Sequence, residues 1–225
     1  MNSLTTLAKD LKSAKQICRS VKSSQAEVLA DIYHKDTNIV IWQRKLEDML
    51  TQAANNILMA NPMLQISLAV TPQNTFSAVN TVLGSSLMAT ILCKDIAKLV
   101  DMFCYLFNLK HAGLRLTSLD NAMCPRFHVD AVPCRLVTTY QGIATEWLPH
   151  RVADRSKLGI GNQGMPDEKS GLFQNVSDIQ QLCPGDVALL KGESWEGNQG
   201  AGLIHRSPQL LSETHRLLLT IDFMD

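Results

Sequence analysis

The segment GLRLTSLDNAMCPRFHVDAVPCRLVTTY (113–140) has the texture of a β-sheet protein, with short apolar runs separated by Asn, Asp and Pro. The same texture continues to the end of the chain. The expected strands are 113–119, 126–132, 134–140, 186–191, 201–205 and 216–223. Several short strands without helices between them favour an antiparallel sandwich or jelly roll over a parallel α/β sheet.

The half of the chain before this segment is expected to be mainly helical. The pattern predicts helices over 3–22, 44–60 and 94–108, and strands over 38–43 and 64–70. Because no linker-like break separates the halves, the sequence predicts a single domain over residues 1–225, of class α+β. In it, residues 1–111 form a helical elaboration on a core formed by residues 112–225. The expected core is a double-stranded β-helix, the jelly-roll architecture.

Composition excludes several classes of function. The 225 residues are 45% hydrophobic, which is enough for a sizeable core, and 21 basic residues balance 21 acidic ones. Nucleic-acid and anionic-membrane binding both need a basic surplus, so neither kind of partner is expected. Residues 50–92 carry no charge, but asparagines, glutamines and two prolines interrupt every candidate membrane span. With no secretory signal and six widely spaced cysteines, the sequence predicts a cytoplasmic protein without disulfides.

The glycine motif at 159–164 (GIGNQG) matches G-x-G-x-x-G, but its surroundings argue against a nucleotide site. A dinucleotide fingerprint follows a strand and opens an apolar helix, and neither flank here has that character. We therefore interpret Pro149–Ser170, which is polar and glycine-rich, as one long loop. Long loops in compact domains are often functional lids.

The chemically informative pattern is His128-Val129-Asp130, followed by His205 in a later expected strand and Arg216 in the last one. Side chains alternate along a strand, so His128 and Asp130 share a face. An imidazole from a neighbouring strand would complete a facial set of two nitrogens and one carboxylate. Such a set leaves the opposite coordination positions open, as non-haem Fe(II) oxygenases require.

This order of residues resembles the Fe(II)- and 2-oxoglutarate-dependent dioxygenases, which have a double-stranded β-helix. The resemblance covers about residues 113–223. It implies that His128, Asp130 and His205 bind Fe(II) as catalytic ligands, and that Arg216 holds the far carboxylate of 2-oxoglutarate. The blocks CPRFHVD, TYQGIATEWLP and LIHRSP also resemble an uncharacterised bacterial family, a domain of unknown function.

Two further residues are candidates for the cosubstrate site. Arg206 is the second choice as carboxylate anchor, because it directly follows His205 and adjacent side chains of a strand point to opposite faces. Tyr140 shares a strand face with Thr138 and is a candidate hydrogen-bond donor to a bound carboxylate, although a hydroxyl bonded within the core is an equally good interpretation.

Two alternatives remain open at this level. The same ligands fit a zinc-handling or metal-sensing jelly roll without oxygenase activity, which would not need Arg216. A barrel without metal, acting as an interaction module, would use His128 and Asp130 as a core hydrogen bond. The sequence leaves open whether the substrate is a small molecule or a protein, and it leaves open the oligomeric state.

Overall fold

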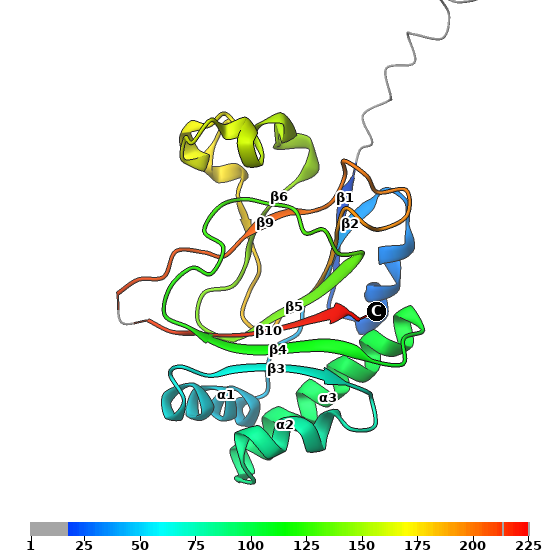
Figure 1. Ribbon diagram of the computed structural model, residues 1–225, viewed down its shortest axis with the longest axis vertical. Coiled ribbons are helices and arrows are strands. Elements are labelled where there is room, and N and C mark those ends of the chain that lie inside the picture. Colours follow the sequence, from blue (N-terminus) through cyan, green and yellow to red (C-terminus); the bar gives the residue numbers. More distant parts are fainter. Residues whose placement is uncertain (1–17, 213, 225) are drawn as a thin grey trace, which may run out of the picture.

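The computed structural model describes residues 18–212 and 214–224, and it shows a mixed α+β fold (Figure 1). Helices cover one face of a large sheet. The other face of this sheet packs against a small sheet, with an apolar core between them. In the described residues there are three α-helices: α1 (Asp48–Ala60), α2 (Thr75–Leu83) and α3 (Leu87–Phe107). None of the described helices has the length and apolar character of a membrane span.

The large sheet has the strand order β1-β2-β8-β5-β10-β4-β3, and only the β1–β2 pair is parallel. Both halves of the chain therefore contribute to one sheet, since β1, β2 and β3 precede residue 111. Its strands are β1 (Arg19–Ser23), β2 (Thr37–Trp42), β3 (Gln65–Val70), β4 (Ala112–Leu119), β5 (Cys134–Gln141), β8 (Val187–Lys191) and β10 (Arg216–Phe223).

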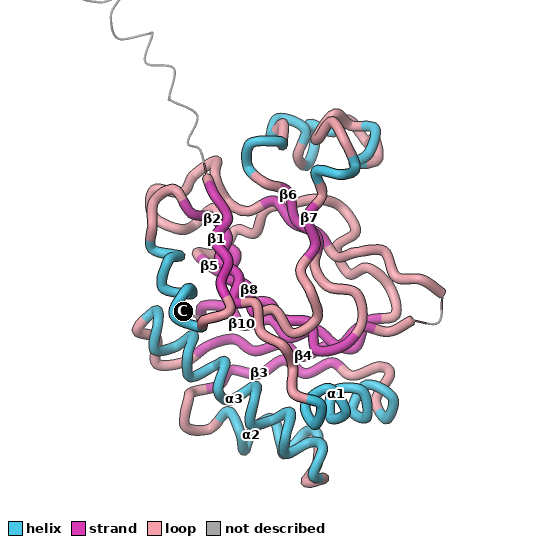
Figure 2. The backbone as a smooth tube through the Cα atoms, turned by 180° about the vertical axis from the view of Figure 1, so that it is seen from behind, coloured by secondary structure: helices cyan, strands magenta, loops and turns pink. Residues whose placement is uncertain are grey.

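The small sheet has the order β7-β6-β9, formed by β6 (Glu146–Leu148), β7 (Gln180–Gln181) and β9 (Ile204–Arg206). The connection that joins β6 and β7 forms a lobe beyond this sheet, visible at the top of Figure 2. The 3-10 helices are η1 (Ala26–Tyr33) before β2 and, in the lobe, η2 (His150–Val152), η3 (Arg155–Lys157), η4 (Gly159–Asn162), η5 (Asp167–Lys169) and η6 (Val176–Asp178).

Strand alternation assigns the two faces of the large sheet. In β10, Leu217, Leu219 and Ile221 belong to the core shared with α1 and α3, whereas Leu218 belongs to the core shared with the small sheet. Arg216 lies on the same side as Leu218, because it is two residues away. The start of β10 therefore presents its polar side chain to the space between the sheets.

Most expected elements are confirmed, with differences at their ends. The strands expected at 38–43 and 64–70 are β2 and β3, the helix expected over 44–60 begins at Asp48, and the helix expected over 94–108 begins at Leu87. No expected element corresponds to α2. The helix expected over 3–22 is wrong for residues 19–22, which pair with β2 as the polar edge strand β1, and its residues 3–17 lie outside the described residues.

A further difference concerns the H-x-D segment. Residues 126–132 were expected to form a strand, but they form a loop with one isolated bridge between His128 and His205. Pro125 and Pro133 flank the segment and have no N–H group for a sheet ladder, which excludes it from regular pairing at both ends.

Candidate metal centre

The isolated bridge places His128 beside His205. The His128 N–H donates to the His205 carbonyl at 3.0 Å, and the His205 N–H donates back to the His128 carbonyl at 3.0 Å. Because His205 also pairs with Trp147 in the small sheet, the 126–132 loop continues that sheet by one residue pair. The loop is therefore fixed where it carries the first histidine.

The other end of the loop packs against the turn after β8. The Glu193 N–H donates to the Asp130 carbonyl at 2.9 Å, and the Gly192 N–H donates to the Pro133 carbonyl at 2.9 Å. A Cβ at Gly192 would lie 2.0 Å from the Val132 carbonyl oxygen, so the close approach requires a glycine. This contact fixes the backbone at Asp130.

The structure brings His128, Asp130 and His205 together. One ligand atom from each side chain lies within 4.8 Å of the others. His128 Nε2 is 3.6 Å from Asp130 Oδ1, and His205 Nε2 is 3.4 Å from Asp130 Oδ2. The two imidazole rings have centroids 4.6 Å apart. Three side chains from two segments thus converge on one point.

Backbone carbonyl groups orient both imidazoles. His128 Nδ1 is 2.9 Å from the Arg126 carbonyl oxygen, and His205 Nδ1 is 3.3 Å from the Leu203 carbonyl oxygen. A proton on each Nδ1 satisfies these carbonyls, so in a neutral imidazole the Nε2 atom, which faces Asp130, is the atom free to bind a metal. Ligating histidines commonly have this arrangement, because the second ring nitrogen fixes the tautomer and the ring orientation.

The electrostatics of the cluster favour the ligand forms of His205 and Asp130, whereas a protonated His128 must lose its Nε2 proton to bind a metal. Burial lowers the pKa of His205 to about 4, against the opposing charge of Asp130, so this imidazole is neutral at pH 7. Burial alone would raise the pKa of Asp130, but the hydrogen bond from His128 and the charges of His205 and Arg135 lower it to about 2. The hydrogen bond with Asp130 raises the pKa of His128. With both imidazoles neutral, two ring nitrogens and an ionised carboxylate form a donor set that fits Fe(II) or Zn(II).

Arg216 lines the same pocket as His128 and His205. Its side chain is 1% exposed, and its guanidinium donates to hydroxyl groups only: Thr139 at 3.1 Å, Thr145 at 2.6 Å and Ser207 at 3.4 Å. Among the described residues, no carboxylate forms an ion pair with it. Burial lowers its pKa to about 10, so the guanidinium keeps its charge at pH 7. A buried cation without a counter-ion is costly, and an anion bound beside it would offset that cost.

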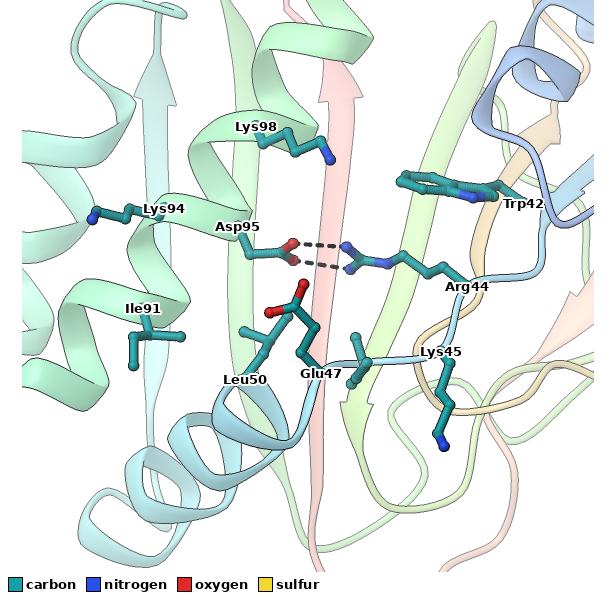
Figure 3. A pocket seen from close by; sticks show the side chains of 10 residues that line it. Trp42, Arg44, Lys45, Glu47, Leu50, Ile91, Lys94, Asp95 and Lys98 are labelled. Carbon is teal, nitrogen blue, oxygen red and sulfur yellow. Dashed lines mark hydrogen bonds and ion pairs between the residues drawn. The ribbon is translucent and has the colours of Figure 1, made fainter.

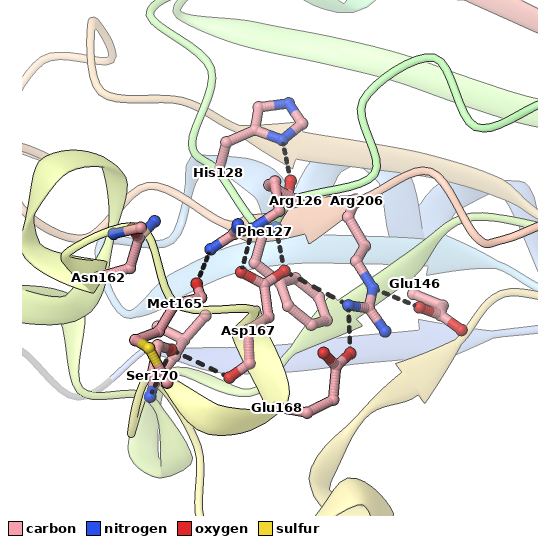
Figure 4. A network of polar contacts seen from close by, with 12 residues as sticks. Arg126, Phe127, His128, Glu146, Asn162, Met165, Asp167, Glu168, Ser170 and Arg206 are labelled. Atoms are coloured by element: carbon pink, nitrogen blue, oxygen red, sulfur yellow. Dashed lines mark hydrogen bonds and ion pairs between the residues drawn. The ribbon is translucent and has the colours of Figure 1, made fainter.

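Arg206, the alternative anchor, is already paired (Figure 4). It donates to Glu146 at 2.7 Å, Glu168 at 2.9 Å and Asp167 at 3.3 Å, and its guanidinium lies 4.3 Å from the centroid of the Phe127 ring. Three carboxylates exceed its single charge. Arg206 therefore has far less capacity than Arg216 to bind a further anion.

Asp167 is the centre of this network and had no signal in the sequence beyond its place in a polar loop. Its side chain is 3% exposed and accepts hydrogen bonds from the Arg126 guanidinium and the Phe127 N–H, both at 2.8 Å (Figure 4). These residues precede His128, and Arg206 follows His205. The lobe beyond the small sheet is thus bonded to the neighbours of both histidines.

Tyr140 is not brought to the site, which corrects its candidate role. Its hydroxyl donates to Asp95 Oδ2 at 2.7 Å, and its ring belongs to the core on the helix side of the large sheet. Asp95 also accepts two hydrogen bonds from Arg44, at 2.7 and 2.9 Å (Figure 3). Strand alternation explains the outcome: Thr139, not Tyr140, faces Arg216.

The fold resembles those of solved dioxygenases at low sequence identity. The dioxygenase for auxin oxidation 1 from Arabidopsis thaliana, solved with 2-oxoglutarate, is 10% identical with a TM-score of 0.50 over 92% of each chain. The rice dioxygenase for auxin oxidation is 12% identical with a TM-score of 0.51, over 92% of this chain and 83% of that one. No curated protein matches the sequence. A family model matches residues 23–222, and the chain thus belongs to the family described as protein of unknown function DUF1826.

Proposed function

We propose that this protein is a non-haem Fe(II)- and 2-oxoglutarate-dependent dioxygenase that oxidises a C–H bond of its substrate in a hydroxylase-type reaction. One observation carries the proposal. The two histidines of the His128–Asp130–His205 cluster line the same pocket as a buried guanidinium that has no carboxylate partner among the described residues. The first group is a metal donor set, and the second needs an anion.

The residues have separate tasks in this proposal. His128, Asp130 and His205 would hold Fe(II) on one side, leaving the opposite positions for cosubstrate and oxygen. Bound iron and 2-oxoglutarate together supply the oxidising chemistry. Arg216 would bind the far carboxylate of 2-oxoglutarate through its planar fork, while Thr139 and Thr145 hold the guanidinium in place.

The proposed core is a double-stranded β-helix. Two facing sheets with mainly antiparallel pairing support it, as does the likeness to the two auxin-oxidising dioxygenases. The cluster lies where the β9 end of the small sheet meets the 126–132 loop, and Arg216 begins a central strand of the large sheet. The site would therefore occupy the space between the two sheets.

The test is an anaerobic titration of the purified protein with Fe(II) and then 2-oxoglutarate. We expect a visible metal-to-ligand charge-transfer band that His205→Ala abolishes. Arg216→Lys should raise the 2-oxoglutarate concentration at half-saturation, since one ammonium cannot replace the two-pronged contact. Arg115→Lys is the matched control, because Arg115 lies on β4 with a 55% exposed side chain and is outside the pocket.

Two outcomes would contradict the proposal. A protein that holds iron but gives no band with 2-oxoglutarate is not an oxygenase of this class. A protein purified with nearly one zinc per chain and unresponsive to 2-oxoglutarate would instead support a zinc-handling or sensing role for the same three ligands.

A further inference from the structure

A row of four charged side chains runs across strands of the large sheet, from the exposed Arg115 to the candidate metal cluster. Arg115 on β4 donates to Asp222 on β10 at 2.7 Å. Asp222 accepts two more hydrogen bonds from Arg135 on β5, at 2.6 and 3.1 Å. Arg135 then donates through its remaining terminal nitrogen to Asp130 Oδ2 at 2.7 Å. The row alternates in charge and ends on a metal-ligand candidate.

The position of Asp130 makes this contact important. Asp130 lies in a loop rather than in a strand, so no sheet ladder fixes its backbone on both sides. Its carbonyl oxygen accepts one hydrogen bond from Glu193, and this bond does not set the direction of the carboxylate. A ligand must be held within about 0.5 Å of its binding position by surrounding groups.

Arg135 has the geometry of a clamp and not of a cosubstrate anchor. All three of its nitrogens are used: Nε and one terminal nitrogen bind Asp222, and the other terminal nitrogen binds Asp130. Strand register explains the fit, because Asp222 of β10 lies directly opposite Arg135 of β5. The side chains of Arg135, Asp222 and Asp130 are 22%, 7% and 14% exposed, so solvent screens their contacts little.

We propose that Arg135 is the positioning residue for Asp130: it orients the carboxylate for the metal, and Asp222 in turn orients Arg135. This inference rests on the proposed function, since it assumes that Asp130 is a ligand. It assigns to the last strand of the chain a second task at the site, besides carrying Arg216.

The experiment measures Co(II) binding to the full-length protein under anaerobic conditions by the d–d absorption of the bound ion. Arg135→Gln should weaken Co(II) binding by about 10- to 100-fold, as loss of an outer-shell partner does. Arg135→Lys should recover part of that loss, since an ammonium can still donate to Asp130. Arg115→Gln is the matched control: Arg115 also contacts Asp222 but not Asp130, and the expected loss is less than about fivefold for an exposed pair.

Thermal unfolding of the metal-free variants separates positioning from general stability. A purely structural Arg135 would lower the unfolding temperature while the folded protein bound Co(II) as tightly as wild type, and this result would overturn the inference. If Arg135→Gln does not fold, Asp222→Asn tests the same idea, because it keeps the guanidinium but weakens its anchor. Wild-type Co(II) affinity in that variant would also overturn it.

The failures of the two proposals give different results. Wild-type protein that binds neither Fe(II) nor Co(II) contradicts the proposed function, and the positioning role fails with it. Wild-type protein that binds both ions, with Arg135→Gln and Asp222→Asn binding equally well, contradicts the positioning role alone.

Discussion

Arg44 and Arg216 lie on opposite sides of the large sheet, and the two side chains differ in what surrounds them. On the helix side, Arg44 forms a two-pronged pair with Asp95 and donates to the Gly185 carbonyl, so the charge is neutralised within the fold. Burial lowers the pKa of Arg44, but the hydrogen bonds with Asp95 outweigh it and leave the pKa above its ordinary value. On the other face, Arg216 donates only to hydroxyl groups among the described residues, and burial lowers its pKa. A guanidinium that is paired with a carboxylate stabilises the fold, whereas a guanidinium without such a partner can bind an anionic ligand.

The largest expected effect comes from removing the two charges in turn. Arg44→Met leaves the largely buried carboxylate of Asp95 without a counter-ion, and should lower the free energy of unfolding by about 3–5 kcal/mol. Arg216→Met removes a charge that has no counter-ion, and should cost less than about 1 kcal/mol. Urea unfolding of the metal-free proteins measures both. Equal losses would refute the distinction between the two faces.

The second expected effect concerns the metal cluster. His205→Ala removes one of the three donor atoms, and should weaken Fe(II) or Zn(II) binding by more than about 100-fold, beyond the loss from an outer-shell partner. The free energy of unfolding of the metal-free protein should change much less than the free energy of metal binding, since the substitution leaves the Arg44–Asp95 pair on the helix side of the large sheet intact. Isothermal titration measures the affinity. Unchanged metal binding in a folded variant would exclude His205 as a ligand.

The third expected effect is a dependence of stability on pH. Because His205 titrates at about pH 4 in the folded protein and about 6.5 when unfolded, its contribution is full above pH 6.5 and is lost as the pH falls towards 4. The loss should be roughly 2–3 kcal/mol. His128, whose pKa is raised, acts in the opposite direction: its contribution is present below pH 6.5 and is lost as the pH rises.

Urea unfolding of metal-free wild type and His205→Gln at pH 7.5 and 4.5 measures this dependence. We expect wild type to lose more stability than the variant between the two values. Asp130 does not obscure the comparison, because its stabilising contribution is lost only as the pH falls from about 4 towards 2. Identical losses would mean that His205 is not buried as a neutral group.

The smallest expected effect tests the network around the lobe. Asp167→Asn keeps the shape of the side chain but removes the charge that Arg126 and Arg206 share, and should lower the unfolding free energy by about 1.5 kcal/mol. Asp178→Asn is a control in the same lobe, since Asp178 is bonded only to a local backbone N–H. Equal effects of the two substitutions would show that the network adds nothing beyond local structure.

Local sequence patterns predicted much of the sheet and the convergence of the three candidate ligands. Short apolar runs between turn residues were sufficient to predict β5 at 134–140 and β10 at 216–223, although both faces of each strand are buried. Register was not visible in the sequence. The sequence therefore could not decide between the two interpretations of Tyr140, since a shift of one residue exchanges the two sides of a strand, and the structure shows the core hydrogen bond.

The polar contacts that surround the cluster could not be predicted. Arg135 and Asp222 are separated by 87 residues and meet only because β10 pairs with β5 in one register. Asp167 reaches Arg126 from a loop whose course no periodicity indicates. Such pairs depend on tertiary structure, whereas the H-x-D spacing and the order of His205 and Arg216 are properties of the chain itself.

The place of β10 in the strand order has a consequence for biosynthesis. This strand is the tenth and last along the described chain, yet it inserts between β5 and β4, in the interior of the large sheet. Until it emerges from the ribosome, two interior strands present unpaired edges, which are templates for association with other chains. A nascent chain that ends before residue 216 also lacks the Arg216 guanidinium. The proposed cosubstrate site is therefore completed in the same step in which β10 completes the large sheet.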